Sequence, residues 1–327
     1  MTVLIITKSD DNESIDFVTD SIKERGGTVF RFDTDRFPTE IRLIAQYSKT
    51  RERLTLADKE AEFDLNDLSA VWYRRLNVAG KIPTTIAPDL RNTSLLESRT
   101  TVLGFIASIK AFHLDQIRRV QHANNKQLQL QVAREFGLET PRTLITNSPE
   151  AVREFANTCE NGVITKMLSS FAIYENGMEK VVFTNPLTAQ DLEDLDGLRF
   201  CPMTFQERVP KRLELRVTIV GNRIFAASID SQSFERARDD WRRDGVAMVN
   251  EWKPYELPPE VEEKLLKLMD YFGLNYGAID IILTPDGRHI FLEINPAGEF
   301  FWLEKSPGLP ISKTLAEVLL GLLHRRS

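Results

Sequence analysis

The chain of 327 residues is longer than one hydrophobic core usually supports, so two or three domains or lobes are expected. Its 42 basic and 48 acidic residues leave a net charge of -6, which argues against a general binding surface for nucleic acid or an anionic membrane. No run approaches the ~18 to 20 apolar residues that span a bilayer, and the N-terminus lacks the features of a secretory signal, so a cytoplasmic protein is expected.

The first third of the chain predicts an α/β domain that opens with a β-α-β unit. An apolar run at 3–6 is followed by Ile15, Val18 and Ile22 at helical spacing, and a second apolar run follows at 29–32. The crossover between these two strands should be right-handed. Further strands are predicted at 41–47, 53–56, 62–65 and 70–73, followed by a long helix at about 90–110.

The rest of the chain predicts a smaller α+β lobe and then a part dominated by strands. Helices are expected at 124–136 and 147–158, and strands at 143–146, 162–166 and 181–184, with a polar connection between the last two. Beyond them, strands are predicted at 203–207, 214–220 and 224–228, a helix at 258–272, and a hairpin of strands 277–283 and 289–294 around the turn 284–287.

The two cysteines, Cys159 and Cys201, have no histidine or second cysteine near them at metal-ligand spacing. Neither a disulfide framework nor a zinc site is indicated. Both side chains are expected to be buried thiols.

The C-terminal hairpin carries three oxygen-bearing side chains at matched positions. Glu293 and Asn295 lie two residues apart on one strand and therefore on one face, and pairing through the turn can bring Asp280 opposite that face. Two carboxylates and an amide are the ligands that Mg²⁺ favours when nucleotide phosphates supply its other oxygens. The alternative is a solvent-facing strand edge with ordinary charges.

Two lysines are candidates for neutralising a triphosphate. Lys126 opens the helix after Asn124-Asn125, and Lys166 ends an apolar strand. For either lysine alone, a solvated surface cation is the alternative. The small residues at 167–172 suggest a phosphate-covering loop, although the segment has no glycine and is neither a P-loop nor a Rossmann fingerprint.

A strand break at 205–210 precedes a pair of charged residues that share a strand face. Backbone groups at such a break could hydrogen-bond an adenine edge. Glu214 suits ribose hydroxyls, and Arg216 suits a transferring phosphoryl group or a developing oxyanion. A cross-strand ion pair is the alternative.

In this order the residues resemble the ATP-grasp superfamily, from about residue 115 to the end. Over nearly the whole length, the chain is similar to the microviridin-type graspetide macrocyclases, at 32–38, 71–75, 122–129 and 292–300. The segments 113–115 and 171–174 look closer to the ester-forming than to the amide-forming branch.

The resemblance implies an ATP-grasp fold of the α/β class, with α+β lobes and ATP held between the second and third of three parts. These are a Rossmann-like pre-ATP-grasp domain at 1–115, a central lobe at 116–202 and a C-terminal lobe with the metal site at 203–327. It also implies residue roles: Lys126 and Lys166 at the phosphates, Glu207, Arg208 and Val209 at adenine, Glu214 at ribose, Asp280, Glu293 and Asn295 at Mg²⁺, and Arg216 at the phosphoryl group and the tetrahedral intermediate.

The partner implied by the resemblance is a precursor peptide whose leader docks on the helix at 188–195. There Asp191 and Asp194 would pair with a leader arginine, with a solvated helix face as the alternative. The expected reaction is ATP-dependent closure of ester rings between Asp or Glu side chains and Ser or Thr hydroxyls. Amide formation, addition of a free amino acid, and a non-catalytic nucleotide-binding regulator are the alternatives, and a homodimer is left open.

Overall fold

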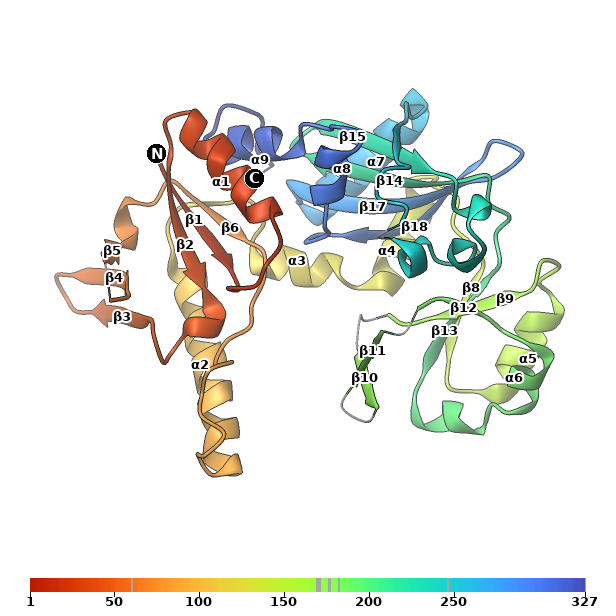
Figure 1. The fold of residues 1–327 in the computed structure, drawn as a ribbon, viewed down its shortest axis with the longest axis horizontal. Coiled ribbons are helices and arrows are strands. Elements are labelled where there is room, and N and C mark those ends of the chain that lie inside the picture. Colours follow the sequence, from red (N-terminus) through yellow and green to blue (C-terminus); the bar gives the residue numbers. More distant parts are fainter. Residues whose placement is uncertain (60, 169–171, 176–177, 182, 246, 327) are drawn as a thin grey trace.

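The computed structural model describes the chain except residues 60, 169–171, 176–177, 182, 246 and 327, and it leaves out the side chains of all of 169–182. In Figure 1 the N-terminal part (red and orange) lies beside a large C-terminal sheet (teal and blue), and the central part (green) lies below that sheet. The molecule is built around three main sheets, called below the N-terminal, central and C-terminal sheets.

The N-terminal sheet is parallel, with strand order β2-β1-β6-β7. It begins with the predicted β-α-β unit, whose apolar strand β1 and amphipathic helix α1 bury Ile5, Ile15 and Ile22 together. The carboxyl ends of β1 and β6 lie at one edge of this sheet, because parallel strands point the same way. Its elements are β1 (Thr2–Thr7), α1 (Ser14–Glu24), β2 (Thr28–Asp33), β6 (Ala70–Tyr73) and β7 (Phe112–His113).

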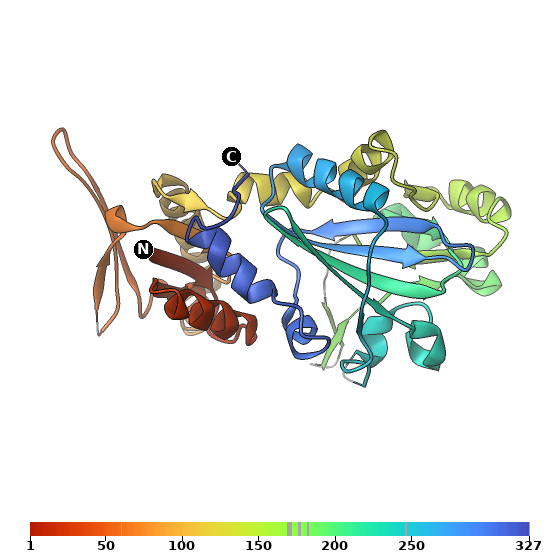
Figure 2. The same ribbon diagram turned by 90° about the horizontal axis from the view of Figure 1, so that it is seen from above.

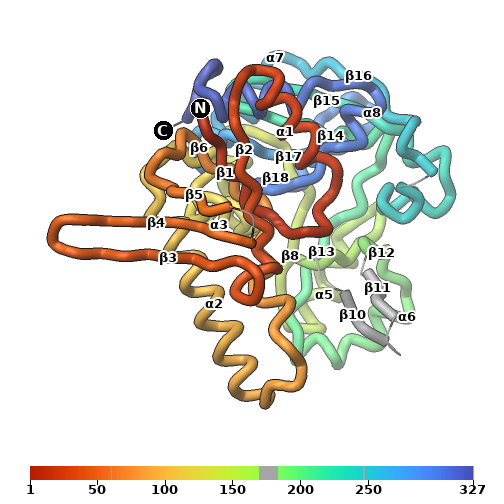
Figure 3. Tube along the Cα trace, turned by 60° about the vertical axis from the view of Figure 1, so that its left-hand side comes forward, coloured from red at the N-terminus to blue at the C-terminus, as the bar shows by residue number. Residues whose placement is uncertain are grey.

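A small antiparallel sheet and a long helix extend from the N-terminal part. The predicted strands form the sheet β3-β4-β5, and the β3–β4 hairpin reaches away from the body in Figure 3. The helix packs on the core mainly through its second half, where Val102, Phe105 and Ile106 are buried. The bounds are β3 (Arg42–Tyr47), β4 (Glu52–Ala57), β5 (Glu62–Asp64) and α2 (Pro88–Ser108).

The central sheet is antiparallel, with strand order β12-β9-β13-β8. Its buried Val163 and Phe205 pack with Val152 of a helix whose N-cap, Ser148, accepts a hydrogen bond from the backbone N–H of Ala151, as the sequence predicts. The elements are β8 (Thr143–Thr146), α5 (Pro149–Asn157), β9 (Val163–Lys166), β12 (Asn185–Pro186), α6 (Ala189–Glu193) and β13 (Met203–Glu207).

The strand predicted at 181–184 is wrong. The chain forms a separate hairpin of β10 (Ala172–Glu175) and β11 (Met178–Val181), and the strand that pairs with β9 there is β12 (Asn185–Pro186). Local propensity marks the apolar residues around Val181 as extended, but it does not determine which strand they pair with. The predicted polar connection therefore contains a hairpin.

The C-terminal sheet is antiparallel, with strand order β16-β15-β14-β17-β18. One of its faces is apolar and packs under α4 and α7, where Leu215, Ile279 and Leu265 are buried together. Gly273, with φ +63°, ends α7 in the left-handed conformation that glycine adopts without strain. The elements are α4 (Lys126–Glu135), β14 (Leu213–Val220), β15 (Arg223–Ile229), β16 (Lys253–Pro254), α7 (Pro259–Phe272), β17 (Tyr276–Leu283) and β18 (His289–Asn295).

Several elements were not predicted. The helix α9 packs against α1, so the end of the chain returns to the N-terminal part, as Figure 2 shows for the blue helix beside the red one. The unpredicted helices are α3 (Ile117–Ala123), α8 (Phe301–Lys305) and α9 (Ile311–Leu319), with 3-10 turns at Thr34–Arg36, Leu65–Asp67, Asp196–Phe200, Ser231–Ser233, Glu235–Ala237 and Trp241–Asp244. None of the helices in the described ranges is long and apolar enough to cross a membrane.

The packing crosses the expected domain boundaries at 115/116 and 202/203. The helix α4, which follows the first boundary, packs on the C-terminal sheet, whereas β13, which follows the second, belongs to the central sheet. The division 1–115, 116–202 and 203–327 therefore stays a proposal about the order of units along the chain. Cys159 is buried, but Cys201 is exposed, so the expectation of two buried thiols is wrong for Cys201, which follows a surface 3-10 turn.

Candidate functional site

The C-terminal hairpin brings its three oxygen-bearing side chains onto one face. Asp280 pairs with Glu293 across β17 and β18, and Ala278 pairs with Asn295, so Asp280 lies on the face of Glu293 and Asn295, as predicted. The ladder shifts by one residue directly after Asp280. Unbroken pairing from the turn, where Ile281 pairs with Phe291, would place Asp280 opposite Leu292, so the bulge is what brings Asp280 opposite Glu293. A bulge also increases the local twist.

Lys126 reaches this face from the first turn of α4. Its Nζ lies 3.0 Å from Oδ1 of Asn295, 3.0 Å from the carbonyl oxygen of Ile294 and 3.3 Å from Oε2 of Glu293. The buried amide of Gln129 fixes α4 in place, because its Nε2 donates to the carbonyl of Ile294 (2.8 Å) and its Oε1 accepts from the backbone N–H of Ile294 (2.9 Å). Lys126 is therefore held beside Glu293 and Asn295 rather than solvated.

The second predicted lysine belongs to the same charge cluster. Burial lowers the pKa of Lys166, and the charge of Lys126 lowers it further, while Glu293 and Asp280 act in the opposite direction. Burial alone would raise the pKa of Glu293, but the charges of Lys126 and Lys166 lower it to about 2. Glu293 is thus an ionised carboxylate near neutral pH, with two ammonium groups close to it.

Arg216 supplies a fixed guanidinium on the same face. It lies opposite Asp280 in the β14–β17 ladder, and its Nη1 donates to Oδ1 of Asp280 at 2.7 Å. Its Nη2 donates to the carbonyl oxygen of Glu299 at 3.0 Å, and its Cζ lies 5.6 Å from the centre of the Trp302 ring. Burial lowers the pKa of Arg216, but Asp280, Tyr276 and Glu293 together raise it above its ordinary value, so the group stays charged. Arg216 therefore also forms the cross-strand ion pair that was the alternative interpretation, with Asp280 as its partner.

Glu214 lies two positions before Arg216 and has a different partner. Its Oε1 is 3.0 Å from Nζ of Lys211. Burial raises the pKa of Glu214, against the opposing charge of Lys211. A buried carboxylate of this kind can accept hydrogen bonds from hydroxyl groups.

The segment predicted to contact adenine lies where β13 ends. Oε1 of Glu207 accepts from the backbone N–H of Arg142 at 2.9 Å, and Arg208 pairs with Asp239 at 2.8 Å. Val209 is half-buried. The backbone N–H groups of Glu207 and Arg208 are engaged as well, with the carbonyls of Arg142 (3.0 Å) and Gly162 (2.9 Å). Contact of this segment with a base would therefore use its remaining backbone groups.

A further guanidinium near the acids was missed in the sequence. Arg242 binds Asp240 through two hydrogen bonds of 2.8 and 2.6 Å, and the charges of Asp280 and Glu293 add to this pair in raising its pKa. Asp240 also accepts from the backbone N–H of Thr184 at 3.2 Å, which joins this segment to the central part. The only signal in the sequence was an arginine-rich stretch at 236–243 without helical or strand periodicity.

The predicted leader-binding acids lie apart from this cluster, on α6 of the central part (Figure 1). The carboxylate of Asp191 accepts from the backbone N–H and the hydroxyl of Thr188, both at 2.7 Å, which lowers its pKa and completes a capping box. Asp194 is the C-cap of the same helix. The predicted loop 167–172 and the segment 171–174 include residues outside the described part of the chain.

The donor set fits magnesium better than a softer metal. In the described part of the chain, no group of three or more His, Cys, Asp or Glu side chains is placed to hold a metal ion. Asp280, Glu293 and Asn295 are two acids and an amide, and Arg216 and Lys126 neutralise them here. Hard oxygen donors with an ionised Glu293 suit Mg²⁺ that takes its other ligands from water and phosphate.

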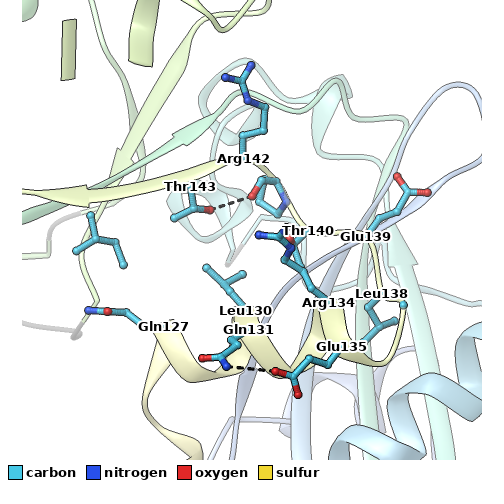
Figure 4. Close-up of a pocket in the computed structure, with 13 residues that line it drawn as sticks. Gln127, Leu130, Gln131, Arg134, Glu135, Leu138, Glu139, Thr140, Arg142 and Thr143 are labelled. Atoms are coloured by element: carbon cyan, nitrogen blue, oxygen red, sulfur yellow. Dashed lines mark hydrogen bonds between the residues drawn. The ribbon is translucent and has the colours of Figure 1, made fainter. Parts of the chain in front are cut away.

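A cavity of about 1030 Å³ lies between α4 and β8. Figure 4 shows its polar wall, where Gln131 bonds to Glu135 along the helix and Thr143 begins β8. None of the predicted site residues lines it. The cavity therefore does not bear on the assignment of the charged cluster.

Comparisons with known proteins were made for the family, for curated proteins and for solved structures. Residues 2–121 match the model of the MvdD pre-ATP grasp domain. The search of curated proteins gave no match.

Three solved structures are similar over almost the entire chain. The macrocyclase MdnC of Microcystis aeruginosa MRC, bound with precursor peptide MdnA, is 52% identical over 98% of this chain and 100% of its own, with a TM-score of 0.90. A RiPP-associated ATP-grasp ligase of Chryseobacterium gregarium, in complex with ADP and a leader and core peptide, is 40% identical over 100% and 98%, with a TM-score of 0.96. The macrocyclase MdnB of Microcystis aeruginosa MRC is 36% identical over 98% and 99%, with a TM-score of 0.83.

Proposed function

Because this chain belongs to the microviridin-type graspetide macrocyclases of the ATP-grasp superfamily, we propose that it closes ester rings in a ribosomal precursor peptide at the expense of ATP. The family consists of ATP-dependent ligases of RiPP peptides. The observation that carries the proposal is the charged cluster on the C-terminal sheet. There Lys126 contacts Glu293 and Asn295, and Arg216 forms an ion pair with Asp280.

The lysines give the cluster its affinity for a triphosphate. We assign Lys126 and Lys166 to the phosphates, because Lys126 forms an ion pair with Glu293 and the charge of Lys166 acts on the same carboxylate. The segment 207–209 is assigned to adenine and Glu214 to ribose. The ADP in the Chryseobacterium gregarium complex supports a nucleotide as ligand of such a ligase.

Asp280, Glu293 and Asn295 would hold Mg²⁺. When bound, it would neutralise phosphate charge and polarise the γ-phosphoryl group. The ion pairs of Asp280 with Arg216 and of Glu293 with Lys126 hold both carboxylates in place on this face.

The proposed reaction has two steps. An Asp or Glu side chain of the peptide attacks the γ-phosphorus of ATP, the bond to the β-phosphate oxygen breaks, and an acyl phosphate and ADP result. A Ser or Thr hydroxyl of the same peptide then attacks the acyl carbon and loses its proton, and phosphate leaves. Arg216 stabilises the oxyanion between these events, because its guanidinium is fixed, buried and charged.

A precursor peptide is the proposed partner, supported by MdnA in the MdnC complex and by the leader and core peptides in the Chryseobacterium gregarium complex. We assign leader docking to α6, with Asp191 and Asp194 facing a leader arginine. Asp191 would share its carboxylate with Thr188, so Asp194 is the freer of the two acids to pair with the leader. A cytoplasmic location and a homodimer also stay proposals.

The test is incubation of the protein with Mg²⁺, ATP and a precursor peptide encoded beside its gene, with MdnA as a second peptide. Mass spectrometry should show the loss of one water per ring, and hydroxylamine should trap the acyl phosphate as a hydroxamate. Mild alkali should reopen an ester but not an amide, so a resistant ring would replace the ester by an amide.

Two rival functions give different products. A ligase that adds a free amino acid would raise the peptide mass by that residue. A non-catalytic regulator would leave ADP release at background with both peptides, and this result would overturn the proposal.

A further inference from the structure

The carboxylate of Glu299 joins the C-terminal sheet to the N-terminal sheet. It accepts close hydrogen bonds from the side chains of Asn12, Arg74 and Arg75. These three donors follow β1 and β6, at the edge where the carboxyl ends of the parallel strands meet. Two sequence segments that carry the family resemblance, 71–75 and 292–300, therefore meet at this one carboxylate.

The arginine side of this contact is rigid. The side chain of Arg74 is 1% exposed, its Nε lies 3.2 Å from Oδ2 of Asp11, and its Cζ lies 5.6 and 6.0 Å from the ring centres of Trp72 and Phe300. Burial alone would raise the pKa of Asp11, but Arg74 holds it below its usual range. The guanidinium that binds Glu299 is thus fixed by a second carboxylate behind it.

The backbone of the same residue holds Arg216. The carbonyl oxygen of Glu299 accepts from Nη2 of Arg216 at 3.0 Å, and the preceding carbonyl, of Gly298, accepts from the hydroxyl of Tyr276 at 2.7 Å. A Cβ on Gly298 would lie 2.5 Å from Cβ of Ala278 and 2.8 Å from Nη2 of Arg216, so only glycine fits. The loop therefore packs directly on the guanidinium assigned to the oxyanion.

Two simpler roles for Glu299 are less consistent with these contacts. A general base would need a carboxylate oxygen free to take a proton from the hydroxyl, whereas both oxygens of Glu299 already accept hydrogen bonds from guanidinium groups. Simple attachment of the N-terminal part is already served by the pair of Arg25 on α1 and Glu317 on α9, at 2.9 Å. That pair has no contact with Arg216 in the described residues, which makes it a natural comparison.

We propose that Glu299 is a positioning residue that fixes the guanidinium of Arg216 for the ring-closing step. Its carboxylate is held by Arg74 and Arg75, and its carbonyl oxygen in turn holds Arg216. The inference rests on the proposed function. Without the carbonyl of Glu299 in place, Asp280 would hold Arg216 through Nη1 only, and the guanidinium would be free to rotate. Phosphoryl transfer would continue, but the hydroxyl would capture the acyl phosphate less often, and water would attack it instead, returning the free carboxylate and phosphate.

The experiment compares Glu299→Gln with Glu317→Gln, using the wild-type protein, ATP and the precursor peptide that it cyclises. Both variants neutralise a half-buried carboxylate that joins the same two parts of the molecule, with side-chain exposures of 28% and 32%. The readout is ADP released per ring closed. We expect this ratio to rise about tenfold in Glu299→Gln, the scale of one charge-assisted hydrogen bond, and to stay at the wild-type value in Glu317→Gln.

Arg75→Gln serves as a second variant if Glu299→Gln does not fold. Arg75 is 35% exposed and its loss leaves Arg74 and Asn12 on the carboxylate, so a smaller rise in the same ratio is expected. An unchanged ratio in the folded variant of Glu299, or an equal rise in Glu317→Gln, would overturn the inference. A wild-type protein that closes no ring would instead overturn the proposed function.

Discussion

The two faces of the C-terminal sheet are built from the same strands and differ in almost everything else. One face is apolar and packs under α4 and α7 through residues such as Leu215 and Ile279. The other face carries the charged site, with Arg216, Asp280, Glu293 and Asn295. Side-chain alternation sends successive residues of each strand to opposite faces. The comparison teaches that one pattern of strands supplies both a rigid core and the rigid support on which a charged site can be ordered.

The charged face is stable because its charges pair with one another. Each acid has a cation at hydrogen-bonding or ion-pair distance, as in Arg216 with Asp280 and Lys126 with Glu293. Breaking one partner of such a pair leaves an uncompensated charge. Substitutions on this face should therefore change chemistry as well as stability, whereas those on the apolar face should change stability alone.

The largest effect is expected from removing both carboxylates of the charged face. Asp280→Asn together with Glu293→Gln keeps the shapes but leaves no anionic oxygen for Mg²⁺. Magnesium-dependent turnover of ATP should be abolished, as followed by ADP release across a Mg²⁺ titration. Undiminished activity would remove the metal assignment.

Arg216→Ala should come next. The oxyanion loses its charged donor, and product formation should fall by about 10²- to 10³-fold while nucleotide binding is kept. The matched change on the other face is Leu215→Ala, which should cost about 2–5 kcal/mol of unfolding free energy but leave the rate per folded molecule unchanged. Rate and thermal unfolding measured on both variants check the contrast, and normal ring formation by the Arg216 variant would refute its role.

A third prediction uses acid. The pKa of Glu293 is about 2 in the folded chain against an ordinary value of 4.5, so its pairing contributes stability that is present above about pH 4.5 and is lost as pH falls toward 2. In Glu293→Gln the fall in unfolding free energy over this interval should be shallower than in the wild type. Denaturant unfolding at pH 5, 4 and 3 measures both slopes, and parallel slopes would contradict the assigned pairing.

The smallest effect is expected on α6, outside the comparison of the two faces. Asp194→Ala should raise KM for a peptide that carries its leader and leave a leaderless peptide unaffected. Asp191→Ala removes the capping box as well, so it should also loosen the helix. Equal KM values for Asp194→Ala and wild type with the leader-bearing peptide would exclude Asp194 from docking.

Much of the site could be predicted because it depends on local rules. Period-two alternation placed Glu293 and Asn295 on one face, and a Pro-Asp-Gly turn predicted the hairpin that brings β17 beside β18. The bulge after Asp280, which puts Asp280 opposite Glu293, left no signal in the sequence. The prediction of a strand at 181–184 was wrong for the opposite reason, because the pairing of a strand depends on the rest of the sheet. Arg242 was missed because its segment has no period from which a face can be read.

The sequence by itself determined which side chains of a single strand share a face through alternation, such as Glu293 and Asn295, the approximate bounds of the amphipathic helices, and which residue types are suited to a nucleotide and Mg²⁺. Tertiary structure alone decided which cation meets which acid, such as Lys126 on Glu293, and that Arg74 and Arg75 reach Glu299 more than 220 positions later. The physical reason is range. Backbone geometry and turn chemistry act over a few residues, whereas contacts between distant segments follow from burying whole faces of sheets and helices against each other.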